Sequence, residues 1–394
     1  MNFVALKMLM GDRAKYFGII LGLAFASMLI TQQASIFVGI MTRTFGFITD
    51  TALPDIWVMD SKVQFIDDVK PLQDTQLLRV RGIEGVEWAM PLYKGLIKAR
   101  LQNGNFQQCN VIGLDDATLV GGPPTMVQGR LEDLRMAEGV IVDEVGAGTR
   151  LARMPVDSSG NPIPLAKPEP LKIGDTLELN DRRAVVVGIC RVSRTFQSQP
   201  VIYTTYSRAT QFAPRERKLL SFVVVKAKQG VDLKTLCDRI AAESGGRLQA
   251  LTAADFSWKT VVYFMKYTGI PINFGIAVIL GFLVGTAIAG QTFYQFTHDN
   301  IKQFGALKAM GTTNLRLLGM IILQAVVTGV IGYGIGVGLA SMFGLLSGRS
   351  ELAFRLLWQT LFVTGGAITI ICILASLLSI IKVIRLEPAI VFKG

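Results

Sequence analysis

Charged residues are scarce in this sequence, and histidine is almost absent. Only 18% of the 394 residues are Asp, Glu, Lys or Arg, whereas soluble domains average about a quarter. The single histidine, His298, excludes an HExxH or paired-histidine metal site and leaves the polar bulk of the chain without a Ser–His–Asp triad. The sequence also lacks a G-x-x-x-x-G-K-[ST] phosphate loop for ATP. We therefore expect no catalytic, cofactor-binding or metal-binding residues.

Cysteine is also rare and lacks the C-x-x-C spacing of a metal or redox motif. The four cysteines are Cys109, Cys190, Cys237 and Cys372. We expect buried, reduced thiols, with one disulfide among the first three as the alternative. Gly146-Ala147-Gly148 is similar to a dinucleotide-binding loop, but Leu151 stands where a third glycine is needed. We interpret it as a strand-to-helix turn capped by Asp143.

Apolar residues, in contrast, make up 51% of the chain, and the mean hydropathy is +0.44. A helix needs about 20 mostly apolar residues to cross a bilayer. Four stretches without charged residues are long enough: 16–42, 267–297, 317–348 and 356–381. The sequence therefore predicts an α-helical membrane protein with four transmembrane helices and a large mixed α/β extracytoplasmic domain.

The predicted segments follow one another along the whole chain. They are an interfacial amphipathic segment (1–16), transmembrane helix 1 (17–41), the extracytoplasmic α/β domain (42–266), transmembrane helix 2 (267–296), a cytoplasmic coupling segment (297–316), transmembrane helix 3 (317–347), a short external loop (348–355), transmembrane helix 4 (356–381) and a cytoplasmic tail (382–394). The first span has an alternative interpretation as a signal peptide, because Ala24-Phe25-Ala26 mimics a cleavage site. We favour a retained helix, since the apolar run resumes after Thr31-Gln32-Gln33.

The net charge of +11 alone would permit a nucleic-acid partner. However, residues 43–266 hold 29 of the 40 basic residues and 25 of the 29 acidic ones, without a basic block, so we expect no nucleic acid to bind. The short flanks of the spans determine orientation instead. Nine basic residues lie on the flanks that we assign to the cytoplasm: Lys7, Arg13, Lys15, Lys302, Lys308, Arg316, Lys382, Arg385 and Lys393. Only Arg349 and Arg355 oppose them, so both termini are predicted to be cytoplasmic.

The polar region reads as a mixture of strands and helices. Asn103-Gly104 and Asn180-Asp181 each separate two strand-like runs and predict hairpins. Residues 221–227, 232–243 and 247–251 predict a strand–helix–strand unit. The proline-rich loop 154–170 suggests a division into two subdomains. Thr252 is a candidate cap of a helix that would continue without interruption into the second span.

Small residues recur at every fourth position in three of the spans. This spacing permits close helix–helix approach in lipid, either within one chain or at a dimer seam. The candidate packing residues are Gly18, Gly22, Ala26, Gly281, Gly285, Ala289, Gly332, Gly336 and Ala340. The spans contain no Asp, Glu, Lys or Arg, which argues against an ion-coupled transporter.

The segment between the second and third spans has helical spacing from Ile301 and a predicted helix stop at Gly311. It reads D-N-I-K-Q-F-G-A-L-K-A-M-G over residues 299–311. This phrase resembles the signature of FtsX/MacB-type ABC transporter permeases, as do 385–394 at the carboxyl end and 55–60, 112–115 and 173–176 in the polar region. Asp299-Asn300 departs from the Glu-Arg or Glu-Asn that the family often has.

The resemblance implies a DevC-like, stand-alone permease subunit without a fused ATPase. It would work as a homodimer beside a separate ABC ATPase that carries ATP and magnesium, in a bacterial cytoplasmic (inner) membrane. An adaptor protein and an outer-membrane duct would complete an export or efflux assembly driven by mechanotransmission. The residues implied in ATPase coupling are Asp299, Asn300, Ile301, Lys302, Phe304, Gly305, Leu307, Lys308, Met310 and Gly311.

Three other functions stay open at this point. The chain could be a lipoprotein-releasing permease, or a non-transporting FtsX-like signal transmitter that activates a cell-wall hydrolase. The polar region of about 225 residues argues against the signal transmitter, because the divisome members of the family carry a much smaller one. A membrane-anchored enzyme is disfavoured by the absence of a catalytic motif.

Overall fold

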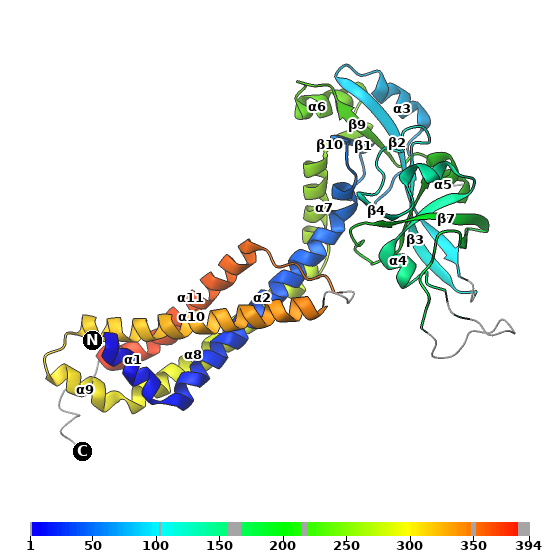
Figure 1. The fold of residues 1–394 in the computed structure, drawn as a ribbon. Coiled ribbons are helices and arrows are strands. Elements are labelled where there is room, and N and C mark those ends of the chain that lie inside the picture. Colours follow the sequence, from blue (N-terminus) through cyan, green and yellow to red (C-terminus); the bar gives the residue numbers. More distant parts are fainter. Residues whose placement is uncertain are drawn as a thin grey trace. The chain divides into compact units, whose positions relative to one another are not determined.

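The computed structural model describes residues 2–101, 104–153, 155, 167–214, 219–347 and 352–384. The chain divides into two compact units, Met1–Ile40 with Thr268–Gly394, and Met41–Tyr267. We call the first the helical unit and the second the α/β domain (Figure 1). Asn103, most of the proline-rich loop, Arg349 and the predicted tail motif at 385–394 lie outside the described residues.

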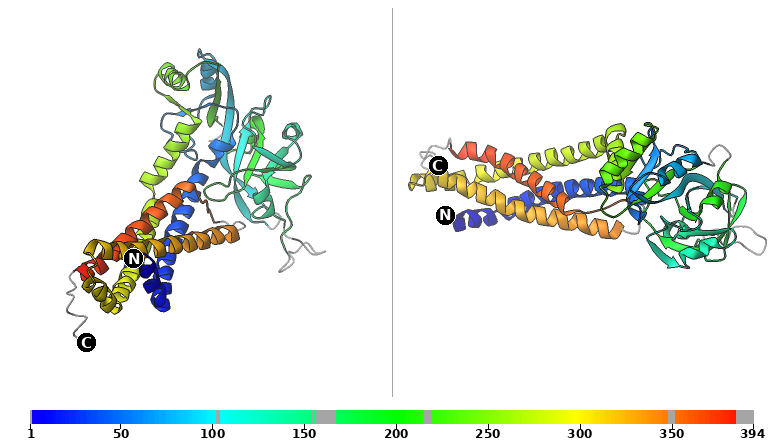
Figure 2. Two further views of the ribbon diagram at one scale, coloured as in Figure 1. Left: turned by 60° about the vertical axis from the view of Figure 1, so that its left-hand side comes forward. Right: turned by 90° about the horizontal axis from the view of Figure 1, so that it is seen from above.

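Four long apolar helices run side by side in the helical unit (Figures 1 and 2). The described helices are α1 (Asn2–Gly11), α2 (Arg13–Asp50), α8 (Ile270–Asp299), α9 (Ile301–Ala309), α10 (Asn314–Leu346) and α11 (Trp358–Ile384). By length and composition, α2, α8, α10 and α11 can each cross a membrane. The predicted architecture of four such helices plus a mixed α/β domain is confirmed.

The first of these helices is longer than the span predicted for it. Helix α2 runs without a break from Arg13 to Asp50, whereas the predicted span covers 17–41. It passes through Thr31, whose hydroxyl is buried and donates to the Thr364 hydroxyl of α11 at 3.2 Å. This hydrogen bond explains how a polar interruption of the apolar run is accommodated inside a helix.

The α/β domain is built around one hydrogen-bonded network of strands in the order β10-β1-β9-β2-β3-β8-β5-β7-β4, with β6 beside β2 and β7. The strands are β1 (Ile56–Asp60), β2 (Val86–Arg100), β3 (Phe106–Leu114), β4 (Thr125–Gln128), β5 (Gly139–Asp143), β6 (Thr176–Leu179), β7 (Arg182–Arg191), β8 (Val201–Thr205), β9 (Phe222–Ala227) and β10 (Leu248–Thr252). The helices are α3 (Asp74–Arg81), η1 (Leu131–Arg135), α4 (Glu144–Gly148), α5 (Tyr206–Phe212), α6 (Leu233–Glu243) and α7 (Ala253–Tyr267).

Both predicted hairpins and the strand–helix–strand unit are confirmed. Strands β2 and β3 pair antiparallel, as do β6 and β7. Between β6 and β7, Asn180 and Asp181 have φ values of 48° and 61°, which is the left-handed pair that a tight hairpin turn needs. Strands β9 and β10 flank α6 in the chain, and β1 pairs with both of them.

The division into subdomains does not lie at the proline-rich loop. Strand β5 precedes that loop and β7 follows it, yet the two strands pair in parallel. Instead, the long strand β2 changes partner in mid-course, pairing with β9 up to Leu92 and with β3 from Tyr93. The two halves of the domain are therefore joined by one shared strand, which a loop-based division could not reveal.

The carboxyl end of α2 belongs to the core of the α/β domain. Trp57 is fully buried, and its ring packs edge-on against Phe47 of α2 and Phe222 of β9. The Asp50 carboxylate accepts hydrogen bonds from the Ser193 backbone N–H at 2.6 Å and from its hydroxyl at 2.9 Å. These contacts explain why the helix continues past the apolar stretch.

The expected continuous helix from Thr252 into the second span is wrong. Thr252 does cap α7, since its hydroxyl oxygen accepts from the Asp255 N–H at 3.1 Å. Helix α7 then ends at Tyr267, and α8 begins at Ile270 after Gly269. The reason is Pro271, which has no N–H to donate to a preceding turn and is tolerated only in the first turn of a new helix.

All four cysteines are free and buried, as expected. Burial raises the pKa of the Cys109 thiol to about 12, so almost no reactive thiolate exists at pH 8 in the folded state. In the unfolded chain the thiol returns to a pKa near 8.5. We predict that a disulfide-exchange reagent at pH 8 reacts slowly with the folded protein and titrates four thiols in denaturant without reductant. A count of two would reveal a disulfide.

Candidate functional site

The segment between α8 and α10 carries the residues that the sequence motif singled out. Helix α8 ends at Asp299, and Asn300 joins it to α9. The Asn300 side-chain amide donates to the Phe296 backbone carbonyl at 2.8 Å. The backbone carbonyl of Asn300 accepts from the backbone N–H groups of Gln303 and Phe304. Asn300 therefore caps the carboxyl end of α8 and the amino end of α9, and the chain changes direction at this residue.

The other end of α9 closes at Gly311, as predicted. Gly311 has φ +86°, a conformation that glycine adopts without strain. Its N–H donates to the Lys308 carbonyl, and the Thr312 N–H donates to the Leu307 carbonyl, both at 3.1 Å. This pair of hydrogen bonds is a Schellman motif. Gly311 thereby turns the chain sharply from α9 towards α10.

One face of α9 is committed to packing inside the helical unit. Phe304 is fully buried, and Gly305 beside it is also buried. The cluster around Phe304 combines residues from α1, α10 and α11: Ala5, Leu317, Met320, Ile321 and Val383, with Ile301 and Leu307 partly buried against it. The Lys308 ammonium donates to the Ile384 carbonyl at 3.1 Å. These motif residues therefore hold the segment in place.

The turn that follows α9 and the first residues of α10 present two large apolar side chains to the surroundings. Met310 is 74% exposed and Leu315 is 82% exposed, and they stand on either side of the Gly311 turn. Lys302 and Gln303 of α9 are exposed as well. The motif-based interpretation included Met310 and Lys302 but missed Leu315. Helical spacing places Leu315 and Leu317 about 200° apart, but both are leucines, so only the burial of Leu317 in the structure shows which of the two is exposed.

The acidic residue of the motif forms a contact within the chain. Asp299 pairs with Lys15, and the Lys15 ammonium also lies 2.5 Å from an Asp12 carboxylate oxygen. Asp12 and Asp299 border a groove of about 940 Å³ that is lined by α1, the start of α2 and the α8–α9 corner. The buried Gln324 of α10 donates to the Ala5 carbonyl of α1 at 2.8 Å. Helix α1 is therefore held next to the α8–α10 segment by this hydrogen bond and by the packing of Ala5 in the cluster around Phe304.

The predicted packing glycines lie where two helices of the same chain approach closely. A Cβ added to Gly22 of α2 would lie 2.5 Å from the Ile288 side chain of α8. At Gly336 of α10, it would lie 2.5 Å from both the Ala24 carbonyl and the Ser27 Cβ of α2. Helix α2 is thus in close contact with α8 and with α10.

The other predicted packing residues also lie at contacts between helices of this chain, but the distance to the neighbouring helix differs among them. A Cβ at Gly332 would lie 2.6 Å from Leu23, and one at Gly285 would collide with Ala26. Gly18 and Gly281 are looser, with 3.6 Å to Thr292 and 3.4 Å to Leu29. Ala26, Ala289 and Ala340 are fully buried. The spacing permits helix contacts either within one chain or at a dimer seam, and in the structure these residues form contacts within one chain.

Outside this segment, the described part of the chain holds the turn predicted at Asp143 but no metal-binding group. There, no group of three or more His, Cys, Asp or Glu side chains could hold a metal ion. Asp143 accepts from the N–H groups of Gly146 and Val201 at 2.7 Å each, which confirms the capped turn. Burial raises the pKa of its carboxyl, against the effect of those two N–H donors.

Two protein families match the chain, and together they cover both units. The MacB-like periplasmic core domain matches residues 16–243, and the FtsX-like permease C-terminal region matches residues 272–388. An uncharacterized ABC transporter permease of Mycobacterium bovis is 22% identical over 223 residues, 56% of this chain and 58% of that protein. Another, from Mycobacterium tuberculosis, is 22% identical over 331 residues, 82% of this chain and 80% of that protein. The chain thus spans less than two thirds of the first relative.

Two solved structures are similar to the α/β domain. The extracellular domain of the noncanonic ABC-type transporter YknZ from Gram-positive bacteria is 10% identical, with a TM-score of 0.33, and the match covers 50% of this chain and 98% of that one. The periplasmic region of MacB from Actinobacillus actinomycetemcomitans is 16% identical, with a TM-score of 0.35, and the match covers 54% and 94%.

The close packing at Gly336 generates a stability prediction. Gly336→Leu would force α10 away from α2, and we expect it to cost about 1–3 kcal/mol of folding free energy. Gly334→Leu is the matched control, because nothing lies within 4 Å of a Cβ there. Thermal unfolding of the detergent-solubilised full chain should show a lower Tm only for Gly336→Leu. Equal Tm values for the two variants would contradict the helix packing described above.

Proposed function

Because the chain belongs to the permease family that joins a MacB-like periplasmic core domain to an FtsX-like C-terminal region, we propose that it is the transmembrane subunit of an ABC-type exporter. ATP and magnesium bind a separate ATPase chain in this proposal, and the present chain is a non-catalytic partner. Both termini and the α8–α10 segment face the cytoplasm of a bacterial inner membrane, and the α/β domain lies outside it.

The observation that carries the proposal is the division of the α8–α10 segment into a buried and an exposed side. Phe304 is buried and holds the segment in place, while Met310 and Leu315 are exposed beside the hydrogen-bonded turn at Gly311. Exposed apolar residues on a well-anchored turn are suited to fill a pocket of a partner protein. An ATPase that grips this turn would pull on α8 and α10 together, since α9 is joined to both.

Helix α2 supplies the mechanical connection that the proposal needs. Its first half packs at Gly22 against α8, and its last turns belong to the core of the α/β domain through Phe47 and Asp50. It is uninterrupted between these contacts, whereas α7 and α8 are separate helices. We therefore assign the transmission of movement to α2 rather than to the second span.

The substrate route follows from what the spans lack. Within the described helices that cross the membrane, no charged side chain marks a polar path between Tyr16 and Thr42 or in the apolar stretches of α8, α10 and α11. A substrate would therefore be taken from the periplasm or the outer leaflet and moved by the α/β domain. An adaptor protein and an outer-membrane duct belong to the same proposal.

A homodimer is supported by the surface of α8. Only 17% of the most apolar 18-residue stretch of α8 is buried, against 41% to 50% of the corresponding stretches in the other three helices that could cross a membrane. Its exposed side carries Ile272, Ile276, Ile279 and Leu283, each more than half exposed. Their spacing of four, three and four residues is that of a helix seam packed against a second helix. We propose that α8 packs against α8 of a second copy.

The coupling proposal predicts that Met310→Asp and Leu315→Asp each weaken ATPase binding about tenfold or more, because a charge would enter a desolvated contact. Tagged full-length protein would be purified from its native membranes, and the co-purifying ATPase and its ATP hydrolysis would be measured. Leu78→Asp is the control, as Leu78 of α3 is 66% exposed but distant in the chain. ATPase yield and hydrolysis equal to wild type in both variants would exclude this docking site.

The dimer proposal predicts that Ile279→Cys forms a disulfide-linked dimer when membranes are oxidised with copper phenanthroline. The unmodified chain should not, because its cysteines are buried. Val363→Cys on α11, whose parent side chain is 63% exposed, is the matched control. Non-reducing gel electrophoresis gives the readout. Dimers from Val363→Cys but none from Ile279→Cys would place the seam elsewhere.

A further inference from the structure

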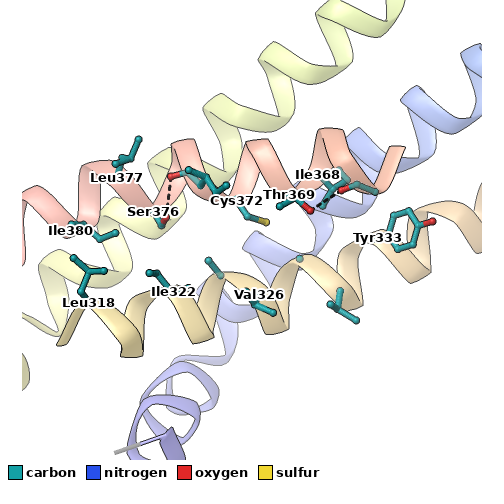
Figure 3. Close-up of a pocket in the computed structure, with 15 residues that line it drawn as sticks. Leu318, Ile322, Val326, Tyr333, Ile368, Thr369, Cys372, Ser376, Leu377 and Ile380 are labelled. Carbon is teal, nitrogen blue, oxygen red and sulfur yellow. Dashed lines mark hydrogen bonds between the residues drawn. The ribbon is translucent and has the colours of Figure 1, made fainter. Parts of the chain in front are cut away.

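An apolar groove between α10 and α11 of the helical unit offers no specific chemistry (Figure 3). The Thr369 and Ser376 hydroxyls along it donate to carbonyls of their own helix, at 2.8 Å and 2.9 Å. Lipid acyl chains would cover this surface as they cover any other apolar helix surface in a membrane, so it indicates no particular ligand. A buried charge is different, because it requires one particular kind of partner.

Lys94 is such a charge, in the core of the α/β domain. Its side chain is only 5% exposed. It lies on β2, two residues after Leu92, where this strand changes partner from β9 to β3. The Lys94 ammonium pairs with the Asp67 carboxylate and donates to the Asn110 side-chain carbonyl at 3.3 Å. No other carboxylate of the described residues pairs with this ammonium.

Asp67 lies on the segment that joins β1 to α3, and we call residues 61–72 the strap. Two strap side chains are buried in the domain core, since Val63 is fully buried and Ile66 is 2% exposed. They belong to the same apolar cluster as Ile48 near the end of α2. The strap is therefore part of the packed core and is not a loose surface loop.

The strap also connects the two helices by which the chain enters and leaves the α/β domain. The Phe65 ring stacks on the Tyr263 ring of α7, with 4.3 Å between the ring centroids. Towards α2 the connection passes through Lys94, whose ammonium lies 5.9 Å from the centre of the Phe47 ring. Lys94 therefore contacts both the strap and the end of α2.

The two members of the ion pair differ in their access to water. The Asp67 side chain is 43% exposed, in contrast to the buried Lys94. If the strap lifted, the Asp67 carboxylate would be hydrated, but the ammonium would stay in the core without its counter-ion, which is strongly unfavourable. An apolar side chain would fill position 94 without needing a partner, so stability alone does not explain a lysine there. The charge instead makes a satisfied core depend on a closed strap.

We propose that Lys94 and Asp67 form a latch that holds the strap closed over the core and against α7 and the end of α2. The structure shows the closed state, in which the strap is joined to the shared strand β2. In the open state the ion pair is broken and the strap is released from β2. The latch stands apart from the proposed function, because it needs neither an ATPase nor a second copy, and its failure would leave the coupling proposal intact.

Hydrogen exchange of the full-length protein in detergent, followed by peptide mass spectrometry, tests the latch. The strap has protected amides to follow, such as the Leu72 N–H, which donates to the Leu220 carbonyl at 2.7 Å. Lys94→Met should speed exchange in the strap about tenfold, because the open state becomes more populated. Lys98→Met is the matched control, since Lys98 lies on the same strand with an exposed side chain.

The pattern of exchange distinguishes a latch from a merely structural residue. Faster exchange confined to the strap and the last turns of α7, with an unchanged Tm, supports the latch. Equal strap exchange in Lys94→Met and Lys98→Met would overturn it. Faster exchange throughout the α/β domain together with a lower Tm would also overturn it, because Lys94 would then only stabilise the fold.

A double variant tests whether the buried charge itself depends on the strap. Asp67→Asn leaves the ammonium without a counter-ion and should both lower the Tm and open the strap. Lys94→Met combined with Asp67→Asn should regain the Tm of Lys94→Met, because no buried charge is then left unpaired. Additive losses of Tm in the double variant would refute the latch. If Lys94→Met does not fold, Asp67→Asn decides alone, and strap exchange equal to that of Lys98→Met would refute the latch.

Discussion

The close approach of α2 to α8 and α10 is the contact on which the rest of the helical unit depends. Lipid offers no hydrophobic drive for helix association, so van der Waals contact at small residues must supply it. Gly22 and Gly336 provide that contact on two sides of α2. Helix α2 continues without a break to Asp50, and its Phe47 packs in the core of the α/β domain, so one helix contributes packing residues to each unit.

The candidate site combines a buried short helix, α9, with exposed apolar residues at the turn that follows it. Phe304 is buried among three helices, while Met310 and Leu315 remain exposed. The Schellman turn at Gly311 ends α9 abruptly and starts α10 in a new direction. The sequence motif contains Phe304, Met310 and Gly311 without distinguishing them; only the structure shows that Phe304 is buried and that Met310 is exposed.

Much of the local structure was predictable, because local signals are strong where turn chemistry is specific. Asn180-Asp181 predicts a hairpin through its tolerance of positive φ, and Gly311 predicts a helix stop for the same reason. The helix break before Pro271 was also predictable from local sequence, because Gly269 and Pro271 disfavour a continuous helix; the expectation of one continuous helix did not take them into account. The partner change of β2 between Leu92 and Tyr93 had no local signal, since strand pairing depends on residues far away in the chain.

The sequence by itself determined the four apolar helices, the α/β domain, and the motif around Phe304, since these depend on composition, length and short-range spacing. The tertiary structure decided which small residues meet, that Asp299 pairs with Lys15, and that Leu315 is exposed. It also decided that α10 and α11 leave an apolar groove between them. The physical reason is that burial and close contact arise only when segments distant in the chain pack together, and no single segment encodes its neighbours.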